Sequence, residues 1–135
     1  MSATVTHSAG ALQAATNAVT ALIGASGKLV FNPTGGSVTA PGTAIATLLF
    51  STPTAFGAAT TAGVATAAPT LPIASDTNAV GGTVAFATFQ TSASSAIVRC
   101  AVAASASDIN MSNGLVVAAG DTVSCSALTY QAVSQ

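Results

Sequence analysis

Charged side chains are what this sequence lacks most. The chain has two basic and three acidic residues among 135, and one histidine. An ordinary soluble domain is about a quarter charged, and surface charge normally keeps a monomer in solution. We therefore expect much of the surface to be covered by copies of the chain or by a partner protein, as in a component of an assembly. The ionisable residues are His7, Lys28, Asp76, Arg99, Asp108 and Asp121.

The same scarcity argues against two other classes of protein. Nucleic-acid binders need clustered Lys and Arg to displace counterions, whereas this chain has a net charge of −1 and two isolated cations. A membrane-spanning helix needs about 20 mostly apolar residues, and the best window, 9–25, is interrupted by polar residues such as Gln13 and Asn17. No basic residue precedes Gly10, so no secretory signal is expected, and synthesis in a cytoplasm is predicted.

Large side chains are also few. Trp is absent, and half of the residues are hydrophobic mainly because Ala is abundant. Since each buried methylene group contributes about 0.8 kcal/mol, an Ala-rich core is thin. Burial in an oligomer would add stability, because binding to the native state alone favours folding. The aromatic residues available to the core are Phe31, Phe50, Phe56, Phe86, Phe89 and Tyr130.

No set of catalytic residues is visible. General acid–base catalysis usually needs His or paired carboxylates, and His7 lies in a tail before the first expected helix. The three Asp residues lie beside turn-forming residues, where Asp commonly bonds its own backbone. They are also too far apart in sequence to form one calcium-binding loop. We therefore predict no enzyme activity and no catalytic, cofactor-binding or metal site.

Cys100 and Cys125 each lie in a strand-like run with apolar residues at two-residue spacing. The favoured interpretation is two buried free thiols that behave as small hydrophobic groups. A disulfide between neighbouring strands is the alternative. A metal site is disfavoured because two Cys without a nearby His lack the number of ligands. Lys28 and Arg99 are interpreted as solvated or interface charges, with Arg99 on the outer face of its strand.

An amphipathic helix is predicted over residues 9–23. Ser8 is a suitable N-cap, and Gly24 or Gly27 can end the helix. The face opposite the apolar stripe carries Gln13 and Asn17 but no charge, which predicts that the helix packs on a partner as well as on its own domain. The stripe recurs at three- and four-residue spacing and comprises Leu12, Ala15, Thr16, Val19, Leu22 and Ile23.

From residue 27 onward, short strand-like runs alternate with turns. Phe86 and Phe89 are three residues apart, so in a strand they point to opposite faces. We expect the core to cover one face, and a second sheet, the helix or a neighbouring subunit to cover the other. Asn113-Gly114 suits a type I′ turn and predicts a hairpin. The expected strands are 28–32, 44–51, 83–90, 96–103, 108–111, 115–118 and 122–132, with weaker candidates at 63–67 and 71–74; the hairpin joins 108–111 to 115–118.

Short strands with regular turns predict a mainly β fold, an antiparallel β-sandwich or jelly-roll-like domain. An Ala-rich helical bundle is disfavoured, because Thr, Val, Gly and Pro are spread evenly after Gly27. The expected organisation is a tail and amphipathic helix over residues 1–26, followed by one β-sandwich domain over residues 27–135.

Four groups of segments follow one another along the chain: 21–31 (ALIGASGKLVF); 45–50 (IATLLF) with 55–59 and 62–66; Asp76 with 82–86; and 108–111 with 119–124. Their order resembles a group of small structural proteins of tailed bacteriophages. The chain departs from this group at Thr88 and Thr91, where an Arg and an Asp are expected. The resemblance implies a β-rich virion component bound to the capsid exterior, collar or tail. Decoration (cement) proteins of this kind often sit as trimers over junctions of the capsid lattice and strengthen the shell.

Three hypotheses follow. The first is a capsid decoration protein of the virion, made in the bacterial host cytoplasm. Its expected partners are the major capsid protein or other virion proteins, and it is expected to form a homo-oligomer, a trimer by the resemblance. The second is a structural subunit of the tail, collar or fibre base. The third is a carbohydrate- or ice-binding β module, suggested by the many Thr residues, although these lack the regular Thr-x-Thr spacing that ice binding would favour.

Overall fold

The helix has the limits that the sequence predicts. A computed structural model describes residues 6–52, 55–60, 66–67 and 73–131, and α1 covers Ala9–Ile23. The Ser8 side chain accepts a hydrogen bond from the Ala11 amide at 3.2 Å, which satisfies one of the amides left free at a helix N-terminus. Gly24 follows the helix with a φ of 69°, a conformation that costs glycine little because it has no Cβ atom.

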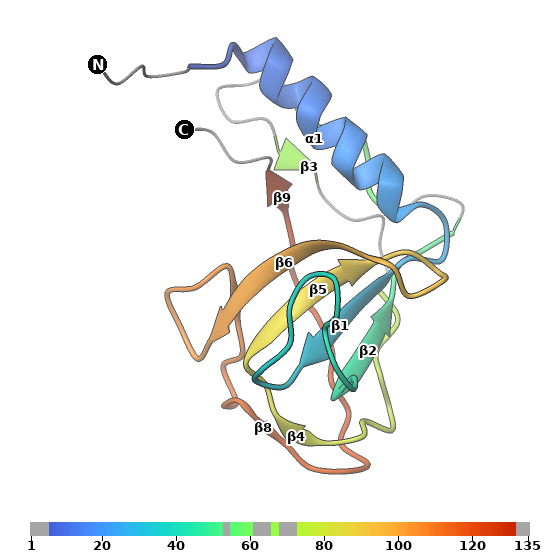
Figure 1. Ribbon diagram of the computed structural model, residues 1–135, viewed down its shortest axis with the longest axis vertical. Coiled ribbons are helices and arrows are strands. Elements are labelled where there is room, and N and C mark those ends of the chain that lie inside the picture. Colours follow the sequence, from blue (N-terminus) through green and yellow to red (C-terminus); the bar gives the residue numbers. More distant parts are fainter. Residues whose placement is uncertain (1–5, 53–54, 61–65, 68–72, 132–135) are drawn as a thin grey trace.

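One curved sheet forms the body of the domain, below α1 in Figure 1. Adjacent strands in it are antiparallel, except for the last two in spatial order, which are parallel. Its five strands are, in spatial order, β2 (Ala46–Leu49), β1 (Lys28–Asn32), β5 (Phe86–Gln90), β6 (Ala96–Ala103) and β7 (Ile109–Asn110).

Short ladders lie outside this sheet. β4 (Gly82–Thr83) pairs with β8 (Val116–Val117), and β3 (Thr66–Ala67) pairs with β9 (Tyr130–Gln131), both antiparallel. The prediction of a mainly β domain preceded by one α-helix is confirmed. The arrangement is compatible with a sandwich, although the part of the chain that is described forms two-residue ladders here rather than a continuous second sheet.

Aromatic rings gather in the core around Phe89. Its ring centroid lies 5.9 Å from that of Phe50, 5.8 Å from that of Phe56 and 6.0 Å from that of Tyr130. These tilted and edge-on contacts are the favourable geometry for aromatic pairs. Leu29, opposite Phe89 on β1, is completely buried beside them. The largest side chains of an Ala-rich chain are thus concentrated at one place.

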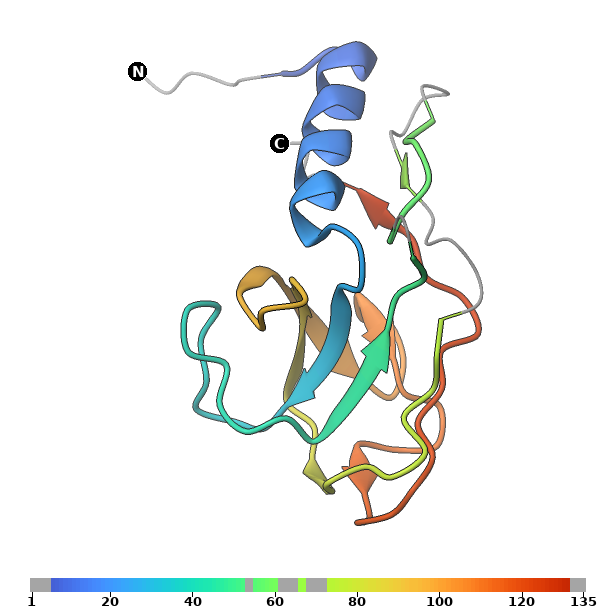
Figure 2. The same cartoon turned by 90° about the vertical axis from the view of Figure 1, so that its right-hand side faces the viewer.

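The loop of residues 33–44 covers the opposite face of the sheet. Figure 2 shows this loop on one side of β1 and the C-terminal segments on the other. Phe86 is 2% exposed beneath the Arg99 guanidinium, whose carbon lies 4.0 Å from the ring centroid. Arg99 also donates to the Gly36 carbonyl at 3.2 Å. Both faces of β5 are buried, as predicted, and a loop of the same chain provides the cover over Phe86.

Buried polar side chains without charge run along this same face. The Thr88 hydroxyl donates to Asn32 Oδ1 at 3.0 Å, and Gln90 Nε2 donates to the Thr88 hydroxyl at 2.8 Å. Buried polar groups cost stability unless they are hydrogen-bonded. Asn32 Nδ2 is the one buried side-chain nitrogen or oxygen atom in the described part of the chain that has no partner. The resemblance predicts an Arg and an Asp near this position, and this chain has an uncharged network instead.

The predicted hairpin of residues 108–111 and 115–118 is wrong. The turn forms, with the Gly114 amide donating to the Met111 carbonyl at 3.0 Å, but the flanking strands pair elsewhere. β7 adds to β6 and β8 pairs with β4. The edge of β6 holds this part of the chain instead. The Met111 amide donates to the Ala103 carbonyl (2.8 Å), and the Asp108 carboxylate accepts from the Ala101 amide (2.9 Å).

Two other long strands are also interrupted. The predicted strand 83–90 divides into β4 and β5, because the amides of Val84 and Ala85 bond to different partners, the carbonyls of Leu115 and Asn32. Residue 132 of the predicted strand 122–132 lies outside the described residues, and the rest is reduced to β9 and one bridge between Val123 and Asp76.

The remaining strand predictions hold in part. Strands 28–32 and 96–103 are confirmed with their limits as β1 and β6. Within 44–51, β2 is shorter than expected. Of residues 63–67, the structure describes only 66–67, which form β3. Of residues 71–74, it describes only 73–74, and Ala74 bridges to Leu49.

Replacing Gly36 by Ala tests the close fit of the loop on the sheet. A Cβ atom at this position would lie 2.4 Å from the Pro41 carbonyl oxygen and 2.8 Å from Phe86 Cζ. Because the nearest atoms belong to backbone, we expect Gly36→Ala to lower the free energy of unfolding by about 1–3 kcal/mol, measured by urea denaturation. In the control Gly10→Ala, the added methyl group meets nothing within 4 Å, and the stability should be unchanged or higher. Equal midpoints for Gly36→Ala and the natural chain would contradict the close fit.

Candidate functional site

The acidic side chains bind backbone amides. Asp76 accepts from the Asn78 amide at 2.9 Å and, across the fold, from the Thr47 amide at 2.8 Å. Asp121 accepts from the Ala118 amide at 2.8 Å, as Asp108 does from Ala101. Within the described residues, no three His, Cys, Asp or Glu side chains lie close enough together to hold a metal ion. The carboxylates therefore hold the backbone of the loops and ladders around them in place.

The basic and imidazole groups do not gather into a site either. Lys28 donates to the Ser94 hydroxyl at 2.8 Å, and Arg99 lies over Phe86 on the outer face of β6, as predicted. His7 is exposed before the N-cap of α1. Each cation has an uncharged partner.

Both cysteines are free. Cys100 is buried in β6, and burial, together with a smaller effect of the Asp108 carboxylate, raises the pKa of its thiol from 9.0 to about 11. Cys125 is half-buried, outside any strand. Burial raises the pKa of its thiol too, against the lowering effect of its hydrogen bond to the Ala127 carbonyl at 3.4 Å. The free-thiol interpretation is confirmed, and only Cys100 has the full burial that was expected of both.

The helix turns its polar side chains inward. Gln13 Nε2 donates to the Ala59 carbonyl at 2.9 Å, and Asn17 Oδ1 accepts from the Ala59 amide at 2.8 Å. This pair binds both backbone groups of one residue, as a neighbouring strand would. The prediction that Gln13 and Asn17 form the outer face is wrong, because these two backbone bonds fix the rotation of the helix. The buried positions are Leu12, Thr16, Thr20 and Ile23.

The side of α1 that faces away from the protein is therefore apolar. Leu22 is 61% exposed, although the periodic pattern predicted it and Ala15 to be buried. The exposed residues recur at three- and four-residue spacing along the whole helix, which places them on one side. We call this surface the outer helix face; it consists of Ala11, Ala14, Ala15, Ala18 and Leu22.

The outer helix face is the candidate functional surface. Exposed apolar patches on soluble proteins commonly mark protein–protein contacts, and α1 stands at one end of the molecule, where a partner can reach it (Figures 1 and 2). Alanine gave no signal in the sequence pattern, because it suits either side of a helix. The sequence feature that indicates the rotation of the helix is the pair Gln13 and Asn17, which are four residues apart and can bind one backbone segment. The described part of the chain has no helix long and apolar enough to cross a membrane.

Comparisons with protein-family models, with curated proteins and with solved structures gave no match to this chain.

The Cys100 thiol predicts a loss of stability in alkaline solution. A raised pKa means that the folded state holds the proton more tightly than the unfolded state. Its contribution is therefore complete below the unfolded pKa of 9.0 and falls as the pH rises toward about 11. We expect a decrease in the free energy of unfolding on the order of 2 kcal/mol over this range, measured by urea denaturation at each pH.

Cys100→Ala is the control for this pH dependence. The variant should be less stable at pH 7, because it leaves a small cavity, but its stability should vary less between pH 9 and 11. Burial also raises the pKa of Cys125 and of Tyr130, so a shallow decrease should remain. An equal pH dependence in both proteins would rule out Cys100 as its source.

Proposed function

We propose that this chain is a structural protein of a bacteriophage virion, in the first place a capsid decoration protein that strengthens the head through protein–protein contacts. The assignment to a bacteriophage rests on the order of the sequence segments described above, which resembles that group of proteins. The observation that carries the assembly part is the outer helix face, because a helix that binds its own domain with Gln13 and Asn17 leaves an apolar side without cover.

Such a face suits association between copies of the chain. In a closed symmetric oligomer every copy contributes the same surface. The exposed Leu22 of each copy is therefore buried at the contact. Full burial of a Leu side chain contributes about 1.5–3 kcal/mol, and the surrounding Ala residues allow helices to approach closely. We propose that α1 forms the contact of a homo-oligomer, a trimer by the resemblance, and that other surfaces bind the major capsid protein or other virion proteins.

The aromatic residues weigh against a carbohydrate-binding module. Carbohydrate sites usually present exposed aromatic rings. Here the five Phe side chains are buried, and Tyr130 is half-buried beside Phe89. A position in the tail, collar or fibre base uses the same kind of contact and differs from the capsid hypothesis in location.

Leu22→Lys tests the helix contact. The added charge stands in the last turn of α1, where the helix dipole favours a cation, so the fold should be retained. We expect the self-association constant to fall by about 10- to 100-fold, measured by sedimentation equilibrium. The matched control is Val80→Lys, since Val80 is 65% exposed and Leu22 61%; this variant should associate like the natural chain. Equal association of both variants would remove α1 from the interface.

Binding to particles tests the function itself. Purified protein should bind mature phage heads that lack it and raise their resistance to heat, whereas labelled protein bound only at the tail or collar would favour the second location. A protein that remains monomeric and binds no part of the particle would refute a role in the virion.

A further inference from the structure

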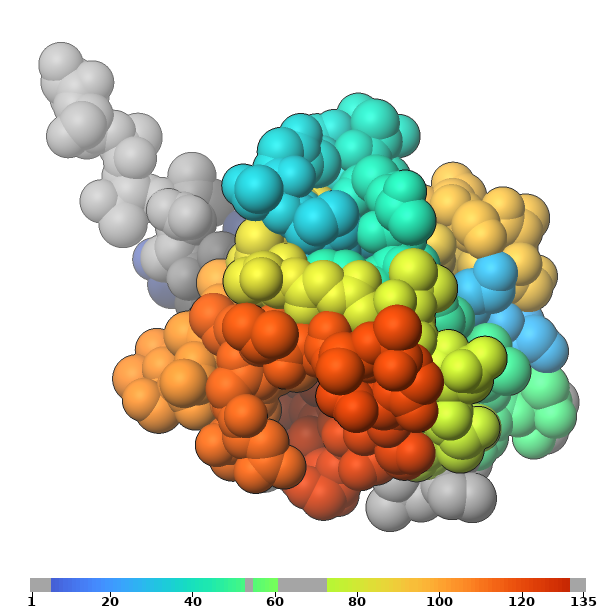
Figure 3. Space-filling model, turned by 90° about the horizontal axis from the view of Figure 1, so that it is seen from below, coloured from blue at the N-terminus to red at the C-terminus, as the bar shows by residue number. Residues whose placement is uncertain are grey.

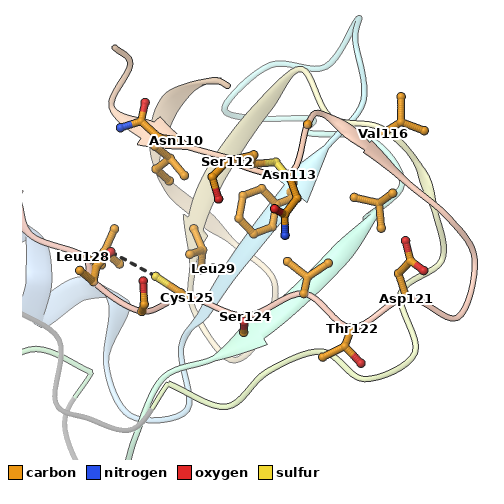
Figure 4. A pocket seen from close by; sticks show the side chains of 18 residues that line it. Leu29, Asn110, Ser112, Asn113, Val116, Asp121, Thr122, Ser124, Cys125 and Leu128 are labelled. Atoms are coloured by element: carbon orange, nitrogen blue, oxygen red, sulfur yellow. Dashed lines mark hydrogen bonds between the residues drawn. The ribbon is translucent and has the colours of Figure 1, made fainter. Parts of the chain in front are cut away.

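The side of the core away from the loop of residues 33–44 is not closed. Seen from below, the space-filling view has a hollow between the orange segment that contains β8 and the red C-terminal segment (Figure 3). A groove of about 350 Å³ lies there. It is lined by Leu29 and Phe31 of β1, by residues 109–114 on one side and by residues 121–128 on the other (Figure 4). The groove therefore reaches two buried residues of the core.

Apolar and polar side chains both line the groove. Several side chains that pack against the core are only half-buried where they line it. The lining also carries hydroxyl and amide groups, among them Ser112, Asn113 and Thr122, and its one charged residue is Asp121, whose carboxylate is bonded to Ala118. A groove lined by apolar side chains, hydroxyls and amides, with a single charged residue, suits an uncharged polypeptide segment. The half-buried apolar residues are Ile109, Met111, Val123, Cys125 and Leu128.

Part of the backbone along the groove has no backbone partner within the described chain. β7 is the last strand of the sheet, and residues 124–128 form no backbone–backbone bond with any described residue. The opposite edge of the sheet is covered, since Leu49 of β2 exchanges two bonds with Ala74 (3.1 and 2.8 Å). An open strand edge is a template for the addition of another strand.

We propose that the groove receives residues 1–7 of a second copy of the chain as a β-strand added alongside β7. This proposal rests on the proposed function, because it names a contact within the assembly. The segment MSATVTH has the required character: no acidic or basic residue other than His7, and Ala3, Val5 and His7 alternating with Ser2, Thr4 and Thr6. Such alternation is typical of a strand with one buried face.

The length and position of the segment also fit. Seven extended residues span about 23 Å, which exceeds the length of the two-residue strand β7. His7 and Ser8 are exposed at the N-terminal end of α1, the end of the helix farther from the sheet, whereas the groove opens on the side of the sheet toward β8 (Figures 1 and 3). The chain would have to return past its own helix and sheet to fill its own groove. A neighbouring copy reaches it without that return.

Val5→Cys tests the proposal through a natural thiol. Cys125 lines the groove, whereas Cys100 is buried. After treatment with oxidised glutathione, we expect a disulfide between Cys at position 5 of one copy and Cys125 of another, seen as a dimer on a non-reducing gel. Thr4→Cys is the matched control. Its side chain points to the other face of the added strand, so its yield should be about fivefold lower or less.

The double variant Val5→Cys, Cys125→Ser decides where the bond forms. Loss of the dimer supports the groove, and an unchanged dimer would mean that two N-terminal segments meet each other, which overturns it. Absence of any cross-link in protein that still assembles and binds heads would also overturn the groove, while the proposed function stands. Failure of assembly and of head binding together would refute both.

Hydrogen exchange gives a second measurement that needs no new cysteine. We compare the full chain, in its assembled form, with a variant that lacks residues 2–7 but keeps the N-cap Ser8. We expect the amides of 109–113 and 124–128 to exchange at least about tenfold more slowly in the full chain. Equal rates at both segments would overturn the proposal.

Discussion

The packing of aromatic rings around Phe89 is the contact on which the rest of this structure depends. It joins three parts of the chain: the sheet through Phe89 itself, the segment of residues 55–59 through Phe56, and the C-terminal strand through Tyr130. Ala59, at the end of that segment, carries both hydrogen bonds to the helix. The place of α1, and the face it exposes, thus follow from a ring cluster in the core.

In the described part of the chain, hydrogen bonds to backbone take the place of ion pairs. Asp76 holds the amides of Thr47 and Asn78, and Asn17 holds the amide of Ala59. Each such bond fixes a loop against an ordered element without a second charge. A charged side chain that binds an amide is worth more than a neutral pair, so three carboxylates are enough to position the loops. Lys28 and Arg99 likewise bind uncharged partners.

The sequence predicts the elements whose periodicity is strong and fails where pairing depends on distant parts of the chain. α1, β1 and β6 have the expected limits, since their signals are local. The Asn113-Gly114 turn forms, but β7 joins β6 because the edge of β6 offers more backbone bonds than a two-residue hairpin. The rotation of α1 could not be predicted, since Ala and Thr suit either side and the partner of Gln13 and Asn17 lies 42 or more residues away. The scarcity of charged residues predicts that part of the surface is covered, but it does not indicate which part.

The outer helix face has a thermodynamic consequence. It contains no ionisable group, so contact through it gains nothing from electrostatic attraction and loses little when salt screens charges. The driving force is the release of water from methyl groups, which is entropic near room temperature and weakens on cooling. An assembly held in this way tightens as it warms through the physiological range and loosens in the cold, over a wide range of ionic strength.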